Sequence, residues 1–294
     1  MELQSRVDEL RGKGLGLATI SYDPPEILAA FVRQHGITFP MLSDVGSETI
    51  KRYGILNTVA MELARPEAAT DPTLVDDIKM YVSVGGPNAR IAFPGIPFPG
   101  TFILDRNGVV QSRFFEDFYI DRNTVSSVMA RLGTGRPVAA SKISSGQLDL
   151  TTYPSDSSVA PGNRITLSLD IVPHRGTHVY APGASNYRVI ALNIEPQPFV
   201  RVLPAQYPPS EIYFFKPLNE RVPVYQKPFT LLQDVVLEGT PQAQAVMRGK
   251  ETLTLKGTLQ YQACDDKVCF NPTELPLSWT LTLRPLVFER PKPQ

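Results

Sequence analysis

Residues 251–283 of the chain are ETLTLKGTLQYQACDDKVCFNPTELPLSWTLTL. Apolar and polar residues alternate along Glu251–Gln262 and again along Leu275–Leu283, a pattern typical of strands with one buried face. The connection between these strands carries Cys264 and Cys269. A connection of this length can bring two Cβ atoms to the roughly 3.8 Å separation of a disulfide. We therefore expect the two cysteines to be bonded to each other when oxidised.

Further short alternating runs precede this pair of strands, and turns and prolines separate them. Such a series of short strands over one half of a chain is typical of an antiparallel β-sandwich. The runs are Gln147–Thr152, Arg164–Val172, Thr177–Tyr180, Tyr187–Ile194 and Phe229–Leu237.

The first half instead alternates helical and extended segments, which predicts an α/β sheet with helices on its faces. Asp105 begins a turn that ends in Asn-Gly, so the segments on either side are expected to form a hairpin. Residues 133–146 are rich in small and turn-forming residues and are interpreted as a linker. The predicted domains are therefore 1–132 and 147–290. The predicted elements of the first half are helices over 2–13, 23–35, 47–53 and 123–132, extended segments over 15–21 and 39–42, and hairpin strands over 101–104 and 109–115.

Composition excludes several classes of protein. The 29 basic and 29 acidic residues balance, so no electrostatic footprint suggests nucleic acid as a partner. No apolar run is long enough to span a bilayer, and the polar start after Met1 does not resemble a signal peptide. Two cysteines are too few for a disulfide scaffold or for a four-cysteine zinc site. No glycine-rich phosphate loop or ligand cluster occurs, so we expect no cofactor and no metal.

The cysteine pair admits three interpretations. A small ring closes little chain, so the bond adds less stability than a long-range bridge would, which favours a bond kept for thiol–disulfide exchange. A permanent structural clip is the second interpretation, and two inert thiols or half of a shared metal site is the third. Lys267 favours a thiolate, whereas Asp265 and Asp266 oppose it. Spacing alone does not separate exchange from a clip.

His174 and His178 are four residues apart, a spacing that suits a metal ion on a helix. Their context predicts a strand and a turn instead, with no carboxylate or cysteine beside them in sequence. We interpret both as surface or packing residues.

The run YQACDDKVCFNP at residues 261–272 resembles the active-site hairpin of the N-terminal domain of DsbD-type thiol:disulfide interchange proteins. HVYAPG at 178–183 and YPP at 207–209 are similar to further landmarks of that domain. The resemblance implies an immunoglobulin-like sandwich in which Cys264 and Cys269 take electrons from a membrane-embedded donor and pass them to periplasmic redox proteins. It favours exchange over a clip and implies a periplasmic or extracytoplasmic location. Tyr180, Tyr261 and Phe270 are the candidates to shield the pair.

The first half resembles the redoxins of the AhpC/TSA family, which have a thioredoxin-like fold. The similar motifs are FPMLSD at 39–44, YGI at 53–55 and FPGTFILDRNG at 98–108. In that fold the reactive cysteine begins the first helix after two strands, whereas here Met1 falls within that helix and no cysteine precedes Cys264. We interpret the domain as an incomplete thioredoxin-like domain without a nucleophile. A gene start placed too far downstream is favoured over a degenerate docking module, because a sheet without those strands has unpaired backbone groups.

Proline can lie in the cis form beside the cysteines of thioredoxin-like sites, and the resemblance makes Pro99 the candidate here, with Pro97 competing. The leading hypothesis is a thiol–disulfide oxidoreductase, or electron relay, in which Cys264 and Cys269 cycle and the partners are thiol redox proteins. One alternative is a non-catalytic binding module with a structural disulfide. The other is a peroxiredoxin-like peroxidase whose catalytic cysteine is missing, and we expect no peroxidase activity from the chain as given.

Overall fold

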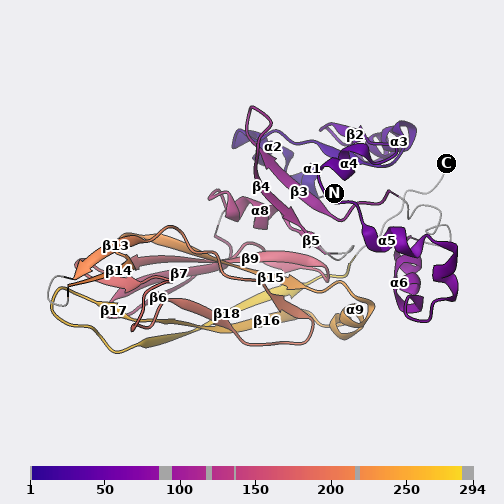
Figure 1. Cartoon of the computed structure of the whole chain (residues 1–294). Helices are drawn as coiled ribbons and strands as arrows, with labels where there is room; N and C mark the ends of the chain where they lie inside the picture. Colours follow the sequence, from indigo (N-terminus) through magenta and orange to yellow (C-terminus); the bar gives the residue numbers. More distant parts are fainter. Residues whose placement is uncertain (1, 86–94, 117–120, 136, 216–218, 287–294) are drawn as a thin grey trace. The chain divides into compact units, whose positions relative to one another are not determined.

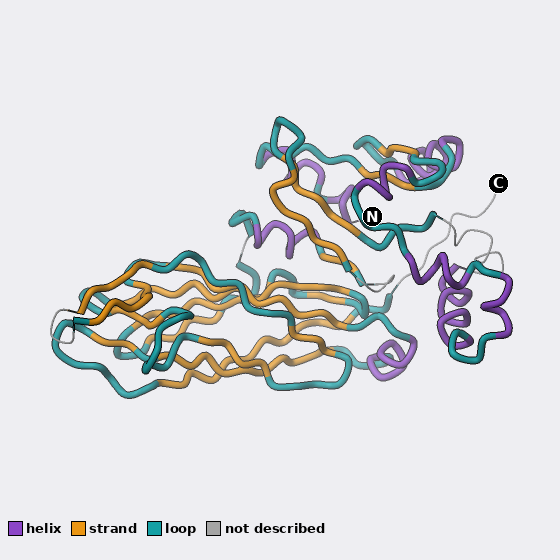
Figure 2. The backbone as a smooth tube through the Cα atoms, viewed as in Figure 1, coloured by secondary structure: helices purple, strands orange, loops and turns teal. Residues whose placement is uncertain are grey.

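The computed structural model describes residues 2–85, 95–116, 121–135, 137–215 and 219–286. The chain divides into two compact units, one formed by the residues up to Val125 and the other by Ser126–Pro285 (Figures 1 and 2). The first unit is mixed α/β and the second consists mainly of antiparallel strands, so the predicted fold class is confirmed. None of the described helices is long and apolar enough to cross a membrane.

The first unit contains short helices and two separate two-stranded sheets. β1 (Thr19–Ser21) pairs in parallel with β2 (Met41–Ser43), and β3 (Gly100–Leu104) pairs antiparallel with β4 (Val110–Phe115). The remaining elements are α1 (Glu2–Ser5), α2 (Val7–Gly12), α3 (Pro25–His35), α4 (Glu48–Arg52), α5 (Thr58–Leu63), the 3₁₀ helix η1 (Pro66–Thr70), α6 (Val75–Gly85) and β5 (Arg122–Asn123).

The predicted hairpin is present as β3 and β4. Asp105 Oδ1 accepts hydrogen bonds from the backbone N–H groups of Asn107 and Val109 at 2.8 and 2.9 Å, so its carboxylate organises the turn as expected. Gly108 completes the turn with φ of 80°, a conformation that residues with a side chain rarely adopt.

The expected cis bond at Pro99 is not found, and Pro97 is not cis either, because every peptide bond among the described residues is trans. The chain is tied down on both sides of Phe98–Pro99: Phe98 N donates to Ile55 O at 2.7 Å, and Pro99 O accepts from Glu116 N at 3.1 Å. With a trans peptide bond, the extended segment before β3 forms both of these hydrogen bonds. Trans is also the form that X–Pro bonds usually take.

The second unit is a β-sandwich with an additional small sheet. One main sheet has the order β12-β15-β9-β7-β6 and the other β11-β16-β18-β8, while the small sheet has the order β13-β14-β10-β17. The strands are β6 (Ser141–Ser144), β7 (Leu148–Pro154), β8 (Ser158–Val159), β9 (Asn163–Pro173), β10 (His178–Tyr180), β11 (Ala191–Ile194), β12 (Val200–Val202), β13 (Glu211–Phe215), β14 (Glu220–Tyr225), β15 (Phe229–Leu237), β16 (Thr252–Tyr261), β17 (Ala263–Cys264) and β18 (Thr273–Leu283); the helices are α8 (Val125–Arg131), which begins at the border of the units, and α9 (Pro241–Met247).

Alternation along the long strands builds the core of this sandwich. Alternate apolar residues of β7 and β9 are buried in it, and β16 and β18 contribute apolar side chains from the other main sheet. Trp279 lies in this core and donates a hydrogen bond from Nε1 to Thr152 Oγ1 at 3.0 Å, which links the two sheets. Because side chains alternate between the two faces of a strand, a shift of one residue would turn the apolar side chains away from the core. Their burial therefore fixes the register of each strand pair.

The domain limits predicted from composition stay a prediction. Ser141–Ser144, inside the predicted linker, forms β6 and pairs with β7, so part of that segment belongs to the sandwich sheet. Residues 287–290 of the predicted second domain lie outside the described residues.

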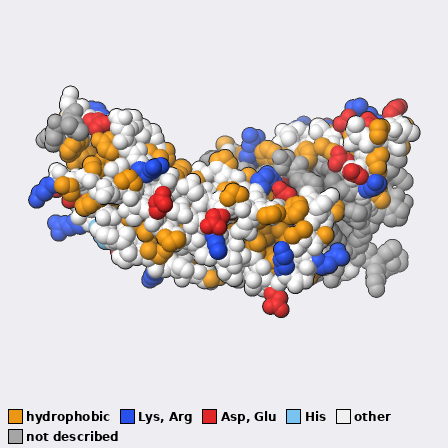
Figure 3. Space-filling view, turned by 90° about the horizontal axis from the view of Figure 1, so that it is seen from below, with side chains coloured by type: hydrophobic (Ala, Val, Ile, Leu, Met, Phe, Trp, Pro, Cys, Tyr) orange, Lys and Arg blue, Asp and Glu red, His pale blue; other side chains and the backbone are white. Residues whose placement is uncertain are grey.

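On the face of the molecule that Figure 3 shows, Lys and Arg side chains are interspersed with Asp and Glu side chains, and hydrophobic side chains gather in several small patches between them. Neither sign forms a continuous field on that face, in agreement with the balanced charge of the chain.

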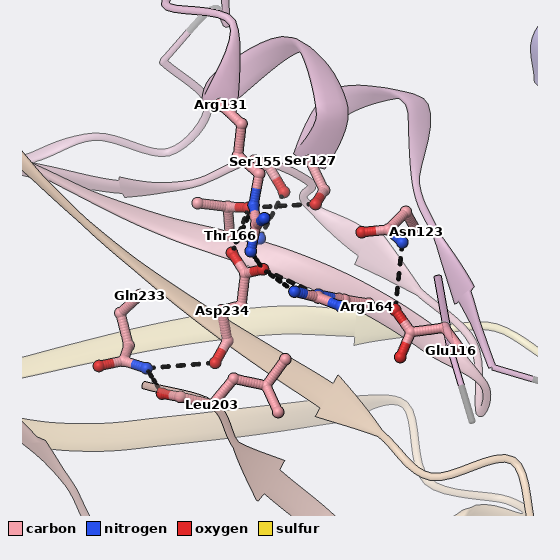
Figure 4. A network of polar contacts seen from close by, with 10 residues as sticks. All are labelled: Glu116, Asn123, Ser127, Arg131, Ser155, Arg164, Thr166, Leu203, Gln233 and Asp234. Carbon is pink, nitrogen blue, oxygen red and sulfur yellow. Dashed lines mark hydrogen bonds and ion pairs between the residues drawn. The ribbon is translucent and has the colours of Figure 1, made fainter. Parts of the chain in front are cut away.

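A buried carboxylate on β15 organises a polar network within the second unit (Figure 4). Asp234 is fully buried and forms ion pairs with Arg131 of α8 and Arg164 of β9, the latter at 2.8 Å. Thr166 Oγ1 donates to Asp234 Oδ1 at 2.9 Å, and Ser127 Oγ lies 3.1 Å from Thr166 Oγ1. The network compensates the charge of the carboxylate and joins the C-terminal part of α8 to the sheet.

We predict that Asp234→Ala lowers the free energy of unfolding by about 3–5 kcal/mol, because it leaves two partly buried guanidinium groups without this carboxylate. Urea unfolding followed by the fluorescence of Trp279, the single tryptophan, measures the loss. Glu274→Ala, which removes an exposed carboxylate from β18, is the control and should change stability by less than about 0.5 kcal/mol. Similar effects of the two substitutions would contradict the assignment.

Candidate functional site

The two cysteines face each other at the end of the small sheet. Cys264 ends β17 and Cys269 lies opposite it, with the sulfur atoms 2.10 Å apart and the Cα atoms 4.0 Å apart. The disulfide expected from the spacing is therefore present.

Asp265 shapes the turn between the cysteines. Its Oδ1 accepts hydrogen bonds from the backbone N–H groups of Lys267 and Val268, each at 2.7 Å, and its own N–H donates to Val268 O at 3.0 Å. The hydrogen bond from Val268, followed by that from Lys267, lowers the pKa of Asp265, so this carboxylate stays ionised at neutral pH. Aspartate at the first position of a turn fixes the hairpin that brings the two sulfurs together.

The two sulfur atoms lie in different surroundings. Cys264 is only 1% exposed and packs with Tyr180, Val222 and Val224. Cys269 is exposed, and the preceding Val268 is 54% exposed. A reagent that approaches from solvent therefore meets the Cys269 side of the bond.

An aromatic pocket of about 220 Å³ adjoins the disulfide. All four strands of the small sheet contribute side chains to it, together with the hairpin turn and the segment after β10. It is lined by His178, Tyr180, Tyr187, Tyr213, Phe215, Val222, Cys264, Asp265, Lys267, Val268 and Cys269.

Tyr180 contacts the disulfide directly. Its hydroxyl oxygen lies 3.0 Å from Cys264 Sγ and 3.5 Å from Cys269 Sγ, and it must be the donor because a disulfide sulfur carries no proton. Its ring stacks on Tyr187 at 3.9 Å, and the Tyr187 hydroxyl donates to Glu220 Oε2 at 2.7 Å. Burial, followed by the nearby Tyr187 and Glu220, raises the pKa of Tyr180, so the hydroxyl remains a donor at neutral and moderately basic pH.

His178 lies across the β10–β17 pairing from Cys264 and is 4% exposed. Its ring packs 4.5 Å from that of Tyr213 and 5.4 Å from that of Tyr180. Burial lowers the pKa of His178, and the negative charge of Asp265 partly opposes this effect. His178 therefore packs against aromatic rings, as a packing residue does. The sequence analysis missed that it also lines the pocket beside the two cysteines.

His174 lies in different surroundings, where it is half-buried and its Nε2 lies 3.4 Å from Asp149 Oδ1. The described residues contain no group of metal-ligating side chains that includes either histidine.

Two of the three predicted shielding residues lie elsewhere. Tyr261 is fully buried in the sandwich core, where its hydroxyl donates to Ser145 Oγ at 2.8 Å, and Phe270 packs against the same core. The reason is strand alternation: three positions separate Tyr261 from Cys264, so they face opposite sides, and Phe270 lies opposite Ala263 on the core side. Of the predicted set, only Tyr180 reaches the sulfurs.

The sequence analysis also missed the pocket aromatics of β13. Tyr213 and Phe215 line the pocket, whereas Ile212 and Phe214, which alternate with them along β13, are 64% and 39% exposed. In the sequence, residues 212–215 form a short continuous apolar run, which is consistent with a strand but does not show which face is functional. Its distance of about 50 residues from the cysteines hid the connection, because the pairing that brings them together is long-range.

We predict that Tyr180→Phe slows reduction of the disulfide by dithiothreitol roughly 10- to 100-fold, because a hydrogen bond to a charged group contributes about 1.5–3 kcal/mol. The thiolate that Cys264 becomes when the bond opens would lose its donor. Tyr225→Phe removes a hydrogen bond to Pro208 O outside the pocket and is the matched control. Unchanged reduction kinetics in the Tyr180 variant would show that the hydroxyl has no part in opening the bond.

Two family models match separate parts of the chain, one within each unit. Residues 1–113 match the AhpC/TSA family model, and residues 151–276 match the model of the thiol:disulfide interchange protein DsbD, N-terminal. No curated protein matches the chain.

Among solved structures, the chain is similar to the N-terminal periplasmic domain of ScsB from Proteus mirabilis, with 13% identity, a TM-score of 0.35 and coverage of 48% of this chain. It spans about half of that protein's chain, 49%. It is also similar to the GAE domain of GGA2p from Saccharomyces cerevisiae and to that of yeast GGA1, each at 13% identity, with TM-scores of 0.25 and 0.26. The latter matches cover 50% and 48% of this chain and 98% and 97% of those domains. On its two family matches, this chain combines a redoxin segment of the AhpC/TSA type with a domain of the DsbD N-terminal type.

Proposed function

We propose that the second unit is a thiol–disulfide oxidoreductase that relays electrons by cycling Cys264 and Cys269 between disulfide and dithiol. The two family matches and the bonded cysteines support thiol–disulfide interchange in general. The specific proposal rests on the different surroundings of the two cysteines. Cys269 is exposed to a partner, whereas Cys264 is buried and its sulfur contacts the hydroxyl of Tyr180.

Reduction begins when a thiolate of a partner dithiol attacks Cys269 Sγ. A bond forms between the partner sulfur and Cys269, the bond between Cys269 and Cys264 breaks, and Cys264 leaves as a thiolate. The Tyr180 hydroxyl then donates a charge-assisted hydrogen bond to that sulfur. The second thiolate of the partner attacks its own sulfur in the mixed disulfide, so the partner leaves oxidised and the cysteine pair keeps both electrons.

The charges around the pair act in opposite directions. Lys267 lines the pocket and favours a thiolate, whereas the ionised Asp265 at the start of the turn disfavours one. Burial of Cys264 also disfavours its charged form. The hydrogen bond from Tyr180 is therefore the interaction through which the fold most directly stabilises the leaving sulfur.

We propose that the partner is a protein with an accessible dithiol or disulfide. By analogy with DsbD-type domains, the proposed electron donor is embedded in the membrane. We propose an extracytoplasmic location on the same ground. The first unit contributes no thiol, because both cysteines of the chain lie in the second, and we assign the exchange to the second unit alone.

Single-cysteine variants test this assignment. Cys264→Ser leaves the exposed Cys269 and should form a mixed disulfide with glutathione disulfide at least roughly 10-fold faster than Cys269→Ser, because the reactivity of a thiol depends on its access and ionisation. Mass spectrometry of samples quenched over time gives both rates.

The same pair of variants unfolded in urea is the control, since without the fold the two thiols should react at similar rates. Equal rates in the native proteins, or a faster reaction at Cys264, would reject Cys269 as the point of attack. A native disulfide that resists every biological thiol would instead support the alternative of a binding module with a fixed clip.

A further inference from the structure

The buried His178 is the histidine nearest to the sulfur that leaves and returns. His178 and Cys264 are direct partners across the antiparallel pairing of β10 with β17. Side chains of such partners lie on the same face of the sheet with Cβ atoms about 4.5–5.5 Å apart. Both residues line the pocket beside the disulfide, which agrees with that placement.

The groups that face His178 come from every element around the pocket. The hairpin contributes Asp265 and Lys267, and β13 contributes Tyr213. Tyr180 lies on the same strand as His178, and Tyr187, hydrogen-bonded to Glu220 of β14, stacks on Tyr180.

Few of these groups can exchange a proton near neutrality. Backbone hydrogen bonds keep Asp265 ionised, and the pKa values of Tyr180 and Tyr187 are raised. Histidine is the side chain whose ordinary pKa lies closest to neutral pH. Burial lowers the pKa of His178, so its resting form is the neutral imidazole, which can accept a proton.

We propose that His178 takes the proton of the Cys264 thiol when Cys264 resolves a mixed disulfide at Cys269. This inference rests on the proposed exchange function. It adds a proton-transfer residue to the site and makes the resolving step depend on the protonation of His178.

The resolving step balances as follows. Cys264 passes its thiol proton to the neutral imidazole, which gives a thiolate beside an imidazolium ion. The thiolate attacks Cys269 Sγ, the bond from Cys269 to the partner sulfur breaks, and the partner leaves as a thiolate. The Cys264–Cys269 bond re-forms, the pair has lost two electrons to the partner, and the imidazolium releases its proton to solvent.

The burial of Cys264 is the reason that an internal acceptor matters. At 1% exposure the thiol has little direct access to water or hydroxide. Tyr180 contacts the sulfur but is a proton donor in this pH range, so it stabilises the thiolate without creating it. His178 supplies the acceptor on the same face.

A stopped-flow experiment on the reduced full chain separates the two steps. With dithiobis(nitrobenzoate) as the disulfide probe, the first thionitrobenzoate released reports attack by Cys269, and the second reports resolution by Cys264. For the wild-type protein we expect a second-phase rate that is almost independent of pH between the pKa of the imidazole and that of the thiol, because the proton moves internally.

In His178→Gln the second-phase rate should instead rise about tenfold per pH unit, in proportion to the thiolate. The ratio of the wild-type rate to the variant rate should therefore grow about tenfold for each pH unit below the pH at which the two rates meet. His178→Phe keeps an aromatic ring beside Tyr213 and should give the same profile. His174→Gln, which changes a half-buried histidine outside the pocket, should behave as wild type.

Parallel pH profiles of the wild-type protein and both His178 variants would overturn the inference. If the variants do not fold, the wild-type profile decides alone: a second-phase rate that climbs tenfold per pH unit would reject an internal acceptor. A wild-type protein that shows no second phase would refute the proposed exchange function itself, which is a different failure from this one.

Discussion

The pairing of β10 with β17 is the constraint on which the site depends. In this register Val179 lies opposite Ala263, with both in the sandwich core, and His178 lies opposite Cys264, with both on the pocket side. Because side chains alternate between faces, a slip of one residue would bury His178 in the core and turn Cys264 away from Tyr180. The burial of Val179 therefore also positions the reactive sulfur.

This register makes a symmetric bond chemically asymmetric. Cys264 follows a core residue and stays buried against Tyr180, whereas Cys269 lies beyond the turn that Asp265 fixes and is exposed. An incoming thiolate is thereby directed to one sulfur, and the charge that develops on the other meets a preorganised donor. The aromatic side chains of β13 and of the segment after β10 close the rest of the pocket.

Local patterns in the sequence predicted the parts of this account that depend on local structure. Alternation predicted the sandwich, the short spacing predicted the Cys264–Cys269 bond, and Asp105 with Asn-Gly predicted the hairpin of the first unit. Closeness in sequence was a less reliable guide to which side chains lie near the cysteines in space. Tyr261 and Phe270 are the nearest aromatics to the cysteines in sequence, yet the alternation of the strands turns both toward the core.

The missed residues are those that long-range pairing brings to the site. Tyr213 reaches the pocket because β13 pairs with β14 and β14 with β10, which no local pattern reveals. His178 looked like an isolated packing histidine because its partner Cys264 lies 86 positions away. At Pro99 the error came from the family resemblance instead. The resemblance suggested a cis peptide bond, but the bond is trans.

The reduction potential of the Cys264–Cys269 couple tests the central claim most directly. The full chain would be equilibrated with graded glutathione and dithiothreitol buffers, and the fraction of dithiol measured after alkylation. The account predicts a reversible transition with a midpoint between about −180 and −300 mV, the range of biological exchange couples. A bond that is reduced only below about −300 mV, or only when the protein unfolds, would identify a structural bridge and contradict the account.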